Sequence, residues 1–475
     1  MPDHISFKNP LPQARVSPGR SLFIASAVSL VLGTASFFVP FLLILWKTAG
    51  ILTLALAAVD CAALFFFTDR LKITRTVNTS LSLGVLTPVT ITVSRSRMKK
   101  RFIPVKFKVF DLFDDSMQCD VMPLSSLKLK PSADGWIFTY NVRPIMRGDW
   151  EFSGVHLLLS SILRFWRLKV VHNTVTTGKT YPNFSILTKH QSLQAILQQG
   201  GEKNIHKRGS GMEFDSLRDW QNGDTVRSVD WRSTSRRKKV TVRQYQEEQD
   251  QNVLLLLDSG YRLHRKDGEL QESQESQENE SGLLLTQFDF ALNAALLLAW
   301  SALKTGDSVA AGVFGNSETW QPPRKGLSAF KSLMNSLYGV QSTGSPSSPA
   351  AALQNAASRL KRRTFIALIS NFRKEDEEQI RWVLPQITSR HLLMMVSLRE
   401  TDAEKLSASD SLCNDLRSKE DNILERTATY AYLKERAALY KKWEHSGILT
   451  LEAAAGNLST ALVNRYLAVK RSGLL

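Results

Sequence analysis

The sequence is poor in cysteine and histidine. Its three cysteines, Cys61, Cys119 and Cys413, are widely scattered and form no C-x-x-C pair. This excludes a disulfide framework and suits a reducing cytoplasm. The eight histidines show no H-x-x-x-H spacing, which argues against a zinc site. The sequence also lacks a G-x-S-x-G motif, a phosphate-binding P-loop and a Cys/His nucleophile pattern, so these enzyme classes receive no support.

Acidic residues are outnumbered by basic ones. The chain has 61 Lys and Arg against 44 Asp and Glu, a net charge of +17. Such a charge is typical of proteins that bind nucleic acid or anionic lipid. No RNA- or DNA-binding motif accompanies it, so we expect no specific nucleic-acid partner. Attraction to a lipid bilayer, worth about 1 kcal/mol for each well-placed Lys or Arg, is the favoured interpretation.

Two long apolar segments stand near the start of the chain, Ser21 to Trp46 and Ile51 to Thr68. Each is close to the roughly 20 apolar residues that cross a bilayer core. Asp60 interrupts the second segment at a cost of about 3 kcal/mol, which its many Leu, Ile, Phe and Val residues outweigh. We therefore predict two transmembrane helices within residues 21–68, with a turn between Pro40 and Gly50. A cleaved signal peptide is the alternative, but a signal has no second span behind it.

The charges around the apolar segments predict the topology. Only Lys47 lies between them, whereas basic residues flank them on both sides: Arg15, Arg20, Arg70, Lys72 and Arg75. The positive-inside rule then places both termini in the cytoplasm. We expect a multi-pass protein of the inner (cytoplasmic) membrane, with residues 1–20 as a cytosolic tail and everything after Asp69 in the cytosol. Asp60 indicates a buried partner or helix association, and a polar residue tolerated against the other helix is favoured over a proton relay.

Residues 70–180 have the pattern of a β domain. Short alternating runs recur at about ten-residue intervals and are separated by turn residues. The runs are Val89 to Val93, Ile103 to Val109, Trp136 to Val142, Trp150 to Leu158 and Leu168 to Val175. This spacing predicts a small β-sandwich.

Residues 251–475 alternate between strand and helix patterns. Val253 to Leu257 is a continuous apolar run that ends at Asp258, as expected of a buried parallel strand. Ser308 to Phe314, Thr364 to Ser370, Leu392 to Leu398 and Ile448 to Leu451 are further predicted strands, with helical patterns between them. Repeated β-α-β units predict an α/β, doubly wound and mostly parallel sheet. Residues 266–282, rich in Gln, Glu and Ser, are predicted to be a disordered insertion.

Between these domains, residues 181–250 form a connector with a dense polar segment from Arg208 to Arg237. Its acids alternate with its arginines, which indicates ion pairs within the segment. Asn222 and Gly223 predict a tight turn. A set of apolar residues could anchor the segment to a core: Phe214, Leu217, Trp220, Val229 and Trp231.

This segment resembles the signature of the domain of unknown function 58 family. The pattern consists of paired glycines, Glu-Phe, an Arg-aromatic step, Gly-Asp, Arg and Asp-Trp. The matching residues are Gly209, Gly211, Glu213, Phe214, Leu217, Arg218, Trp220, Gly223, Asp224, Arg227, Asp230, Trp231 and Arg236. The resemblance extends to the apolar head, to the β region and to Asn464-Arg465-Tyr466 with Lys470 near the C-terminus.

The resemblance carries implications for fold and function. The family's last domain is similar to von Willebrand factor type A domains, and its genes are commonly found beside those for MoxR-type AAA+ ATPases. It therefore implies a membrane-anchored, cytosol-facing scaffold that acts with such an ATPase, or with other von Willebrand factor A proteins, in the assembly of client proteins. The signature residues would then make partner or interdomain contacts. No catalytic reaction is assigned to the family.

Von Willebrand factor A domains often hold Mg²⁺ in a D-x-S-x-S loop at the carboxyl ends of their strands. Here only Asp258 fits, because Gly260 and Arg262 stand where hydroxyl groups belong. The later Asp position is occupied by Asn371, and Ser347 or Ser348 would replace the Thr. We therefore expect no resident cofactor, with Asp258 as the one candidate ligand for Mg²⁺. Asp258 would instead cap its strand or pair with Arg262.

The alternative to a scaffold is a metal-dependent hydrolase that uses Glu213, Asp224, Asp230 and Asp258. Each acid of the signature lies near an arginine in the sequence, and an adjacent cation competes for the carboxylate. Ion pairing within the segment is therefore favoured over partner binding, and both are favoured over catalysis. We expect that the protein is not an enzyme.

Overall fold

The computed structural model describes residues 13–68, 71–95, 106–119, 124–125, 130–132, 135–183, 208–222, 224–246, 251–269, 284–315, 318–400 and 416–474. The chain divides into two compact units, Met1–Asn183 and Phe184–Leu475. Each unit has its own sheets and its own hydrophobic core.

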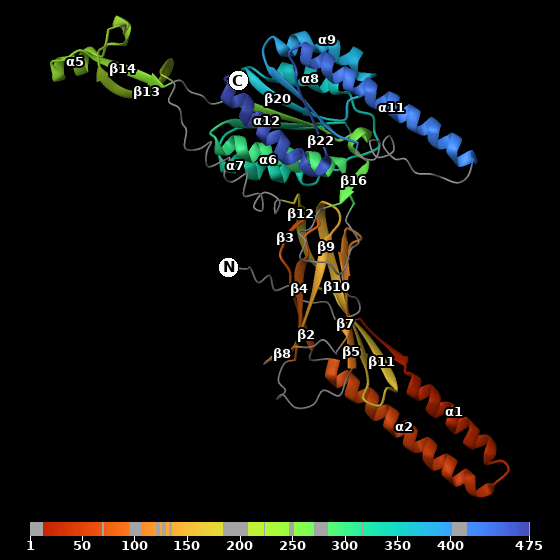
Figure 1. Cartoon of the computed structure of the whole chain (residues 1–475). Helices are drawn as coiled ribbons and strands as arrows, with labels where there is room; N and C mark the ends of the chain where they lie inside the picture. Colours follow the sequence, from red (N-terminus) through yellow and green to blue (C-terminus); the bar gives the residue numbers. More distant parts are fainter. Residues whose placement is uncertain are drawn as a thin grey trace. The chain divides into compact units, whose positions relative to one another are not determined.

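The first unit contains two apolar helices that pack against each other, α1 (Arg20–Ala35) and α2 (Pro40–Thr68) (Figure 1). The indole Nε1 of Trp46 in α2 donates to Ser29 Oγ in α1 at 3.2 Å. Gly33 permits this approach, because a Cβ there would lie 3.1 Å from the indole nitrogen. Residues 41–66 of α2 are long and apolar enough to cross a membrane, whereas α1 is a shorter apolar helix.

The outer ends of the two apolar helices agree with the prediction, but the predicted turn between them is misplaced. The turn lies at residues 36–39 rather than between Pro40 and Gly50, and α2 continues without a break past Lys47 and Gly50. Pro40 opens a helix instead of breaking one, because proline needs no intrahelical N–H partner in the first turn. Phe37 and Phe38 in the turn are 87% and 84% exposed.

The C-terminal part of α2 docks on the β domain. Asp60 is buried, and its Oδ1 accepts the backbone N–H of Leu163 at 3.3 Å. The indole of Trp166 donates to the carbonyl oxygen of Ala57 at 2.8 Å, and Leu64 belongs to the core of the β domain. Asp60 therefore has a buried partner, as one of the expectations had it, but this partner is a loop of the β domain and not the other helix.

The β domain consists of two sheets that share one core. In the first sheet, β1 (Gln13–Pro18), β11 (Trp166–His172), β10 (Gly148–Ser160), β12 (Thr176–Tyr181) and β3 (Ser80–Ser82) follow one another, with β5 (Lys106–Phe113) on β10 and β7 (Leu124–Ser125) on β5. In the second sheet the order is β2 (Leu71–Thr76), β4 (Thr87–Arg95), β9 (Gly135–Pro144) and β6 (Met117–Cys119), with β8 (Lys130–Ser132) on β9.

Alternating side chains of the long strands fill the space between the two sheets. Trp150, Phe152 and Leu157 of β10 face Ile91 of β4 and Phe138 of β9 in one cluster of buried residues. This alternation is what a strand buried on one face requires. The two packed sheets form the sandwich that the spacing of short runs predicts.

One segment and one residue that flank the apolar helices differ from their predicted roles. Residues 13–18, expected in a cytosolic tail, form β1, which pairs antiparallel with β11. Arg75, counted among the basic residues that flank the apolar segments, is buried in the sandwich as the partner of Asp111. Neither partner could be inferred from local sequence, because both lie far along the chain.

The second unit contains a mixed sheet of six strands. The order is β19 (Thr319–Arg324), β18 (Ser308–Phe314), β15 (Asn252–Asp258), β20 (Thr364–Ile369), β21 (Leu392–Leu398) and β22 (Leu449–Ala453). Five strands are parallel and β19 is an antiparallel edge strand. The chain starts at β15 in the middle, builds outward through β18 and β19, and then returns to the other side of β15 with β20.

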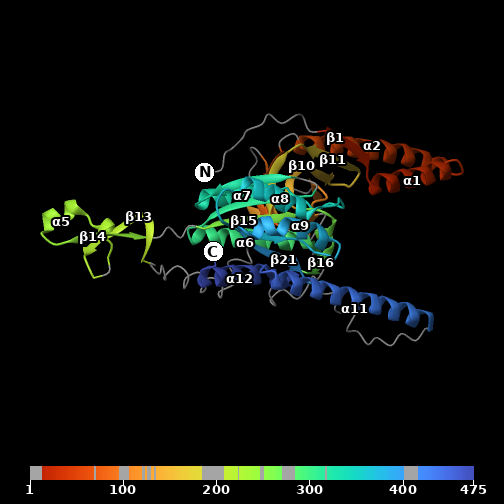
Figure 2. The ribbon, with the colours of Figure 1, turned by 90° about the horizontal axis from the view of Figure 1, so that it is seen from above.

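Helices cover both faces of this sheet, as the alternation of strands and helices predicts. Figure 1 shows α6 (Gln287–Lys304), α7 (Leu327–Leu337) and α12 (Leu458–Ser472) on one face. On the other face lie α8 (Pro349–Arg359), α9 (Asp376–Thr388) and α11 (Leu416–His445), whose apolar side chains join β15 and β20 in a core. Figures 1 and 2 both show the N-terminal part of α11 extending beyond the sheet.

Two predicted features of the second unit lie partly or wholly outside the described residues. The expected insertion at residues 266–282 starts with a strand, because β16 (Lys266–Glu269) pairs antiparallel with β17 (Leu284–Thr286). Residues 270–282 of this insertion lie outside the described residues, and so do residues 187–199 of the connector, whose pattern predicts a helix.

Candidate functional site

The signature segment folds into a small module of residues 208–246, here called the signature module. Its base is the antiparallel pair β13 (Arg208–Asp219) and β14 (Thr241–Gln246). Between these strands the chain forms a short 3₁₀ turn, η2 (Val226–Ser228), and a short helix, α5 (Trp231–Arg237). The N–H of Trp220 donates to the carbonyl of Val240 at 2.9 Å, which closes the loop.

Arg218 and Asp224 form a two-pronged ion pair in this module. Arg218 Nη1 lies 2.8 Å from Asp224 Oδ2, and Nη2 lies 2.5 Å from Oδ1. Asp224 Oδ2 also accepts the backbone N–H of Gln221 at 2.9 Å. The hydrogen bonds from Arg218, together with that from Gln221, lower the pKa of Asp224. Asp224 is thus a charged residue that holds the loop to β13.

Asp230 performs a second structural task, because it caps α5. Its carboxylate accepts the backbone N–H groups of Arg232 at 3.1 Å and Ser233 at 3.3 Å. Arg243 of β14 reaches the same carboxylate at 3.2 Å, and this hydrogen bond is the main reason why the pKa of Asp230 is lowered. The pair of Arg218 and Asp224 agrees with the pairing within the segment that the alternation of acids and arginines predicts, whereas Asp230 takes its partner, Arg243, from outside that segment.

The other signature residues are placed differently. Glu213 lies opposite Gln246 in the β13–β14 register and Phe214 lies opposite Tyr245, while Gly209 and Gly211 belong to the backbone of β13. The side chains of Glu213 and Phe214, and the whole of Gly223, lie outside the described residues. Arg227 lies in η2 and is exposed.

The aromatic side chains of the module are exposed. Trp220 is 41% exposed and Trp231 67%, so the expectation that they anchor the segment to a core is wrong. Val226 and Val240 are also exposed. Around them stand exposed basic residues whose side chains reach solvent: Arg227, Arg232, Arg236, Arg237, Lys238 and Lys239. Exposed aromatic and arginine side chains together are characteristic of protein-binding surfaces.

A second candidate site lies at the carboxyl end of the parallel sheet. Open α/β sheets bind ligands at the point where the strand order reverses, which here is between β15 and β20. Asp258 ends β15 and is fully buried. Its Oδ1 accepts the N–H of Gly260 at 2.8 Å, and its Oδ2 accepts the hydroxyl of Ser370 at 2.6 Å. Asp258 therefore caps its own strand end, one of the two roles expected of it.

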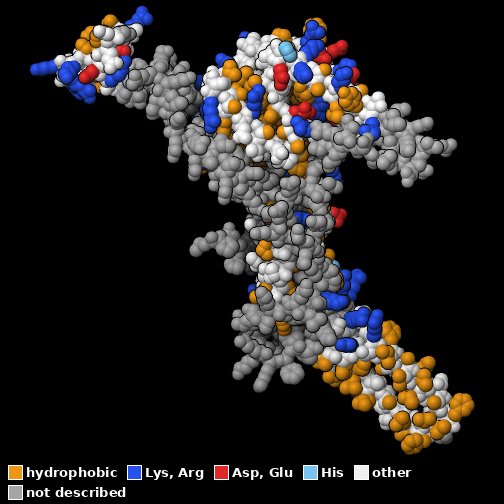
Figure 3. Space-filling view, in the orientation of Figure 1, with side chains coloured by type: hydrophobic (Ala, Val, Ile, Leu, Met, Phe, Trp, Pro, Cys, Tyr) orange, Lys and Arg blue, Asp and Glu red, His pale blue; other side chains and the backbone are white. Residues whose placement is uncertain are grey.

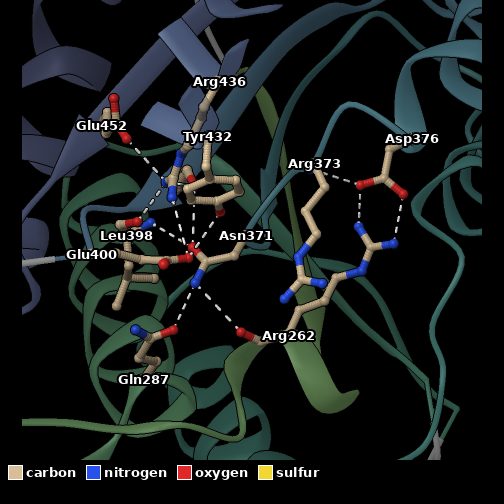
Figure 4. A network of polar contacts seen from close by, with 11 residues as sticks. Arg262, Gln287, Asn371, Arg373, Asp376, Leu398, Glu400, Tyr432, Arg436 and Glu452 are labelled. Atoms are coloured by element: carbon tan, nitrogen blue, oxygen red, sulfur yellow. Dashed lines mark hydrogen bonds and ion pairs between the residues drawn. The ribbon is translucent and has the colours of Figure 1, made fainter. Parts of the chain in front are cut away.

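Arg262 takes a different partner from the expected one. Its guanidinium pairs with both carboxylate oxygens of Asp376 rather than with Asp258 (Figure 4). Both side chains are buried, and the backbone N–H of Arg373 completes the shell of Asp376 at 2.9 Å. Burial opposes the charged form of Arg262, but the hydrogen bonds to Asp376 outweigh it and raise its pKa.

Asn371 connects this pair to the neighbouring strands. Its amide nitrogen donates to Gln287 Oε1 at 2.6 Å and to the carbonyl of Arg262 at 3.4 Å. Its amide oxygen accepts from Ser397 Oγ and from the N–H of Leu398. The amide group is thus satisfied on both sides, which a buried polar group requires.

The same network continues into α11 through Arg436, which is buried (Figure 4). Its Nη2 donates to Ser397 Oγ at 2.7 Å and to the carbonyl of Leu398 at 2.6 Å. Glu452 of β22 and Glu400 pair with the same guanidinium at 3.0 and 3.4 Å. The carboxyl ends of β15, β20, β21 and β22 are thereby joined to α11.

The residues at this edge do not fit a Mg²⁺ site. Both oxygens of Asp258 accept protein hydrogens, the oxygen of Asn371 does the same, and Arg262 brings a positive charge into the loop. Ser348 caps α8, and Ser347 packs against Gly260, where a Cβ would come within 2.6 Å of its hydroxyl. Within the described part of the chain, no three His, Cys, Asp or Glu residues gather as metal ligands do.

The residues near the C-terminus that resemble the family pattern lie in α12. Tyr466 and Lys470 of α12 both bind Asp307, which stands in the turn between α6 and β18. Asp307 in addition accepts the N–H of Gln251 at 3.1 Å. Tyr466 and Lys470 therefore fasten α12 to the start of the sheet.

Sequence reasoning missed Arg436 and Asp376. Arg262 and Asp376 are 114 residues apart, and no motif marks either of them. The one available signal was Arg262 in the place of a hydroxyl ligand, since a buried arginine demands an acid nearby.

Comparison with known proteins adds the following. A family model described as "Protein of unknown function DUF58" matches residues 216–435, which includes most of the signature module and most of the sheet. No curated protein matches the chain.

Two solved structures are similar to parts of the chain. One is an aerotolerance-related membrane protein from Bacteroides fragilis NCTC 9343, at 16% identity and a TM-score of 0.20, over 40% of this chain and 99% of that one. The other is a cohesin module from a Clostridium perfringens ATCC13124 family 33 glycoside hydrolase, at 12% identity and a TM-score of 0.16, over 23% of this chain and 96% of that one. With such low TM-scores, neither carries an argument about this chain.

The family match confirms the resemblance found in the signature segment. It begins within β13 and ends within α11, so it contains Arg218, Asp224, Asp230 and Asp258. Residues 216–435 of this chain are therefore similar to the DUF58 family.

Proposed function

We propose that the protein is a membrane-anchored, cytosol-facing interaction protein that acts with a MoxR-type AAA+ ATPase in the assembly or maturation of client proteins. In this proposal α1 and α2 anchor the chain, the sandwich connects the anchor to the second unit, and a von Willebrand factor A-like domain with the signature module binds partners. The order of the six strands, with β15 central and β19 antiparallel at the edge, supports the von Willebrand factor A-like assignment.

One observation carries the membrane part of the proposal. The exposed surface of α1 and α2 is apolar, and both ends of the pair are rooted in the sandwich. β1 precedes α1 and pairs with β11, whereas β2 follows α2 and contributes Leu71 and Ile73 to the same core. A folded sandwich lies on one side of a membrane, so the two helices cross it as a pair or not at all.

The dimensions favour crossing. From Phe41 to Asp60, where α2 meets the sandwich, the helix runs about 30 Å at 1.5 Å per residue. This equals the hydrocarbon thickness of a typical bilayer. A continuous exposed apolar surface of this kind marks a site of interaction with a membrane or another protein. With Arg15 and Arg20 before α1 and Lys72 after α2, a multi-pass inner-membrane topology with both termini in the cytoplasm follows from the positive-inside rule.

The partner part of the proposal rests on the signature module. Its acids Asp224 and Asp230 are held by Arg218 and Arg243, which leaves exposed tryptophan and arginine side chains to meet a partner. The MoxR-type ATPase is named by the family resemblance alone. A hydrolase that uses these carboxylates is disfavoured, because arginines already occupy the positions where metal ions would bind.

A photo-crosslinking experiment in cells tests this proposal. A benzophenone amino acid replaces Trp231, whose exposure means that the exchange removes little packing, and crosslinked partners of the full-length protein are identified by mass spectrometry. The matched control carries the same amino acid at Leu327, which is 69% exposed outside the signature module.

The ATPase should appear in the conjugates of position 231 and not in those of position 327. Asp230→Ala should reduce this crosslink, because it removes the cap of α5 and the partner of Arg243. If the ATPase is missing at position 231, or appears equally at both positions, the proposed partnership is wrong.

A further inference from the structure

Exposed basic side chains surround the place where the apolar helices leave the sandwich. Figure 3 shows the apolar surface of the two helices and Lys and Arg side chains on the adjoining part of the sandwich. We call these residues the basic collar. All of its members are exposed: Arg15, Arg20, Lys72, Lys108, Arg164, Arg167 and Lys169.

Strand register brings most of the collar onto one face of the first sheet. Leu168 and Val170 of β11 point into the core, so Arg167 and Lys169 point outward. Lys169 stands opposite Arg15 of β1 on one side and opposite Leu158 of β10 on the other.

The next strand extends this row, because Lys108 of β5 lies opposite Leu158. A neighbouring row contains Ser17, Arg167 and Ser160. Neither row contains an Asp or Glu among these register partners, so nothing in them neutralises the positive charge.

The collar lies beside the start of α1 and the C-terminal part of α2. The loop between β10 and β11, residues 161–165, includes Arg164 and binds α2 at Asp60 through the N–H of Leu163. The same loop is tied to the start of α1, because the N–H of Gly19 donates to the carbonyl of Phe165 at 2.6 Å. Arg20 and Lys72 stand at the two junctions between helix and strand.

The loop itself has the character of a membrane interface. Ile162 and Leu163 are 52% and 43% exposed although they belong to a folded sandwich. Trp166, half-buried beside them, donates its indole N–H to α2. Tryptophan is enriched at the boundary between hydrocarbon and headgroups.

We propose that the basic collar binds the phosphate groups of anionic lipids and holds the sandwich against the surface of the bilayer. This inference rests on the proposed membrane anchor and adds the chemistry and the location of lipid recognition.

The dimensions agree with this inference. Each headgroup layer is about 5–7 Å thick, and Arg167 and Lys169, two residues apart on a strand, are separated by about 7 Å. Both rows of the collar therefore fit within this layer. At about 1 kcal/mol for each cation near an anionic surface, the collar is sufficient to fix the orientation of the sandwich.

The experiment measures how close the sandwich stands to the lipid. Full-length protein with its cysteines replaced by serine receives a donor fluorophore at Glu151→Cys, in β10 and outside the collar. It is inserted into nanodiscs of phosphatidylcholine alone or with about one third phosphatidylglycerol, with an acceptor on a small fraction of the lipid headgroups. Energy transfer reports the distance between the sandwich and the bilayer.

We expect energy transfer to rise with phosphatidylglycerol and to fall back at high salt, because exposed charges are screened over about 3 Å at 1 M salt. The variant Arg15→Gln/Arg167→Gln/Lys169→Gln should lose this response. A control with the same change of charge, Lys361→Gln/Arg362→Gln/Arg363→Gln in an exposed turn of the second unit, should keep it. Unchanged melting temperatures of both variants would show that folding is intact.

The outcomes separate the two proposals. If the protein does not enter the nanodiscs, the membrane anchor itself is wrong. If it enters them but the wild type and the collar variant respond equally to phosphatidylglycerol, the anchor stands and the collar inference is overturned.

Discussion

Removing Arg75 should destabilise the sandwich strongly. Its guanidinium holds Asp111, whose side chain is fully buried, through Nε at 3.0 Å and through Nη2. It also donates to the carbonyl of Thr174 at 2.7 Å, and it lies 4.8 Å over the ring of Phe152. Tyr140 donates its hydroxyl to the same carboxylate at 2.5 Å. Arg75 and Tyr140 belong to one sheet and Asp111 to the other, so this cluster ties the two sheets together.

The size of the effect follows from the burial of Asp111. Breaking a buried ion pair by removing one partner costs about 3–5 kcal/mol, because an uncompensated charge stays behind. This is a large part of the 5–15 kcal/mol that stabilise a typical domain. Arg75→Met should therefore cost about 3–5 kcal/mol. The triple variant Arg75→Met/Asp111→Leu/Tyr140→Phe leaves no buried charge, and it should recover most of that loss.

Hydrogen exchange of the full-length protein in detergent measures the stability of the sandwich separately from that of the second unit. Amides of β4 and β9, in the middle of the sandwich, report its free energy of opening. We expect their protection to fall in Arg75→Met and to return in the triple variant, while amides of β15 and β20 in the other unit stay unchanged. The reasoning would be refuted if the triple variant opened as easily as the single one, because the loss would then come from packing and not from an unpaired charge.

Three further outcomes are expected. Gly19→Ala should loosen β1 and cost about 1–3 kcal/mol, because a Cβ at position 19 would lie 2.0 Å from the carbonyl oxygen of Arg164. Gly50→Ala should have no such effect, because the space around Gly50 is open. Hydrogen exchange of residues 13–18 would show the difference. Burial lowers the pKa of His172, so the folded state binds fewer protons than the unfolded chain as the pH falls below about 6.5. Stability of the sandwich should fall between pH 7.5 and 5.5, and less so in His172→Gln; equal slopes in chemical unfolding would contradict this. Millimolar Mg²⁺ should leave the melting temperature of wild type and of Asp258→Asn unchanged, and a rise that occurs only in wild type would show that Asp258 binds the ion.

Much of the parallel sheet can be predicted from the sequence. Ser308 to Phe314 and Leu392 to Leu398 are observed as strands with the predicted ends, because a continuous apolar run between turn residues has few other stable conformations. β19 escaped notice because Pro322 and Pro323 interrupt its pattern, which only an edge strand tolerates. β1 escaped notice because its partner β11 lies about 150 residues away, and pairing at that distance leaves no local trace.

In the candidate sites, too, contacts between residues close in sequence can be predicted, whereas contacts between distant residues cannot. The ion pair of Arg218 and Asp224 spans six residues, so the alternation of acids and arginines along the segment indicates it. The pair of Arg262 and Asp376, and the contacts of Arg436 with Ser397 and Leu398, depend on how strands are arranged in the sheet. Exposure of Trp231 could not be inferred either, since an aromatic residue beside a strand more often packs inward.

Labelling of single cysteines in intact cells tests the membrane topology most directly. In a chain whose own cysteines are replaced by serine, Phe38→Cys marks the turn between α1 and α2, and Lys361→Cys marks the second unit. A thiol reagent that cannot cross membranes, added to spheroplasts, should label position 38 and should reach position 361 only after the inner membrane is permeabilised. Labelling of position 361 in intact spheroplasts, or of neither position before permeabilisation, would contradict the topology proposed here.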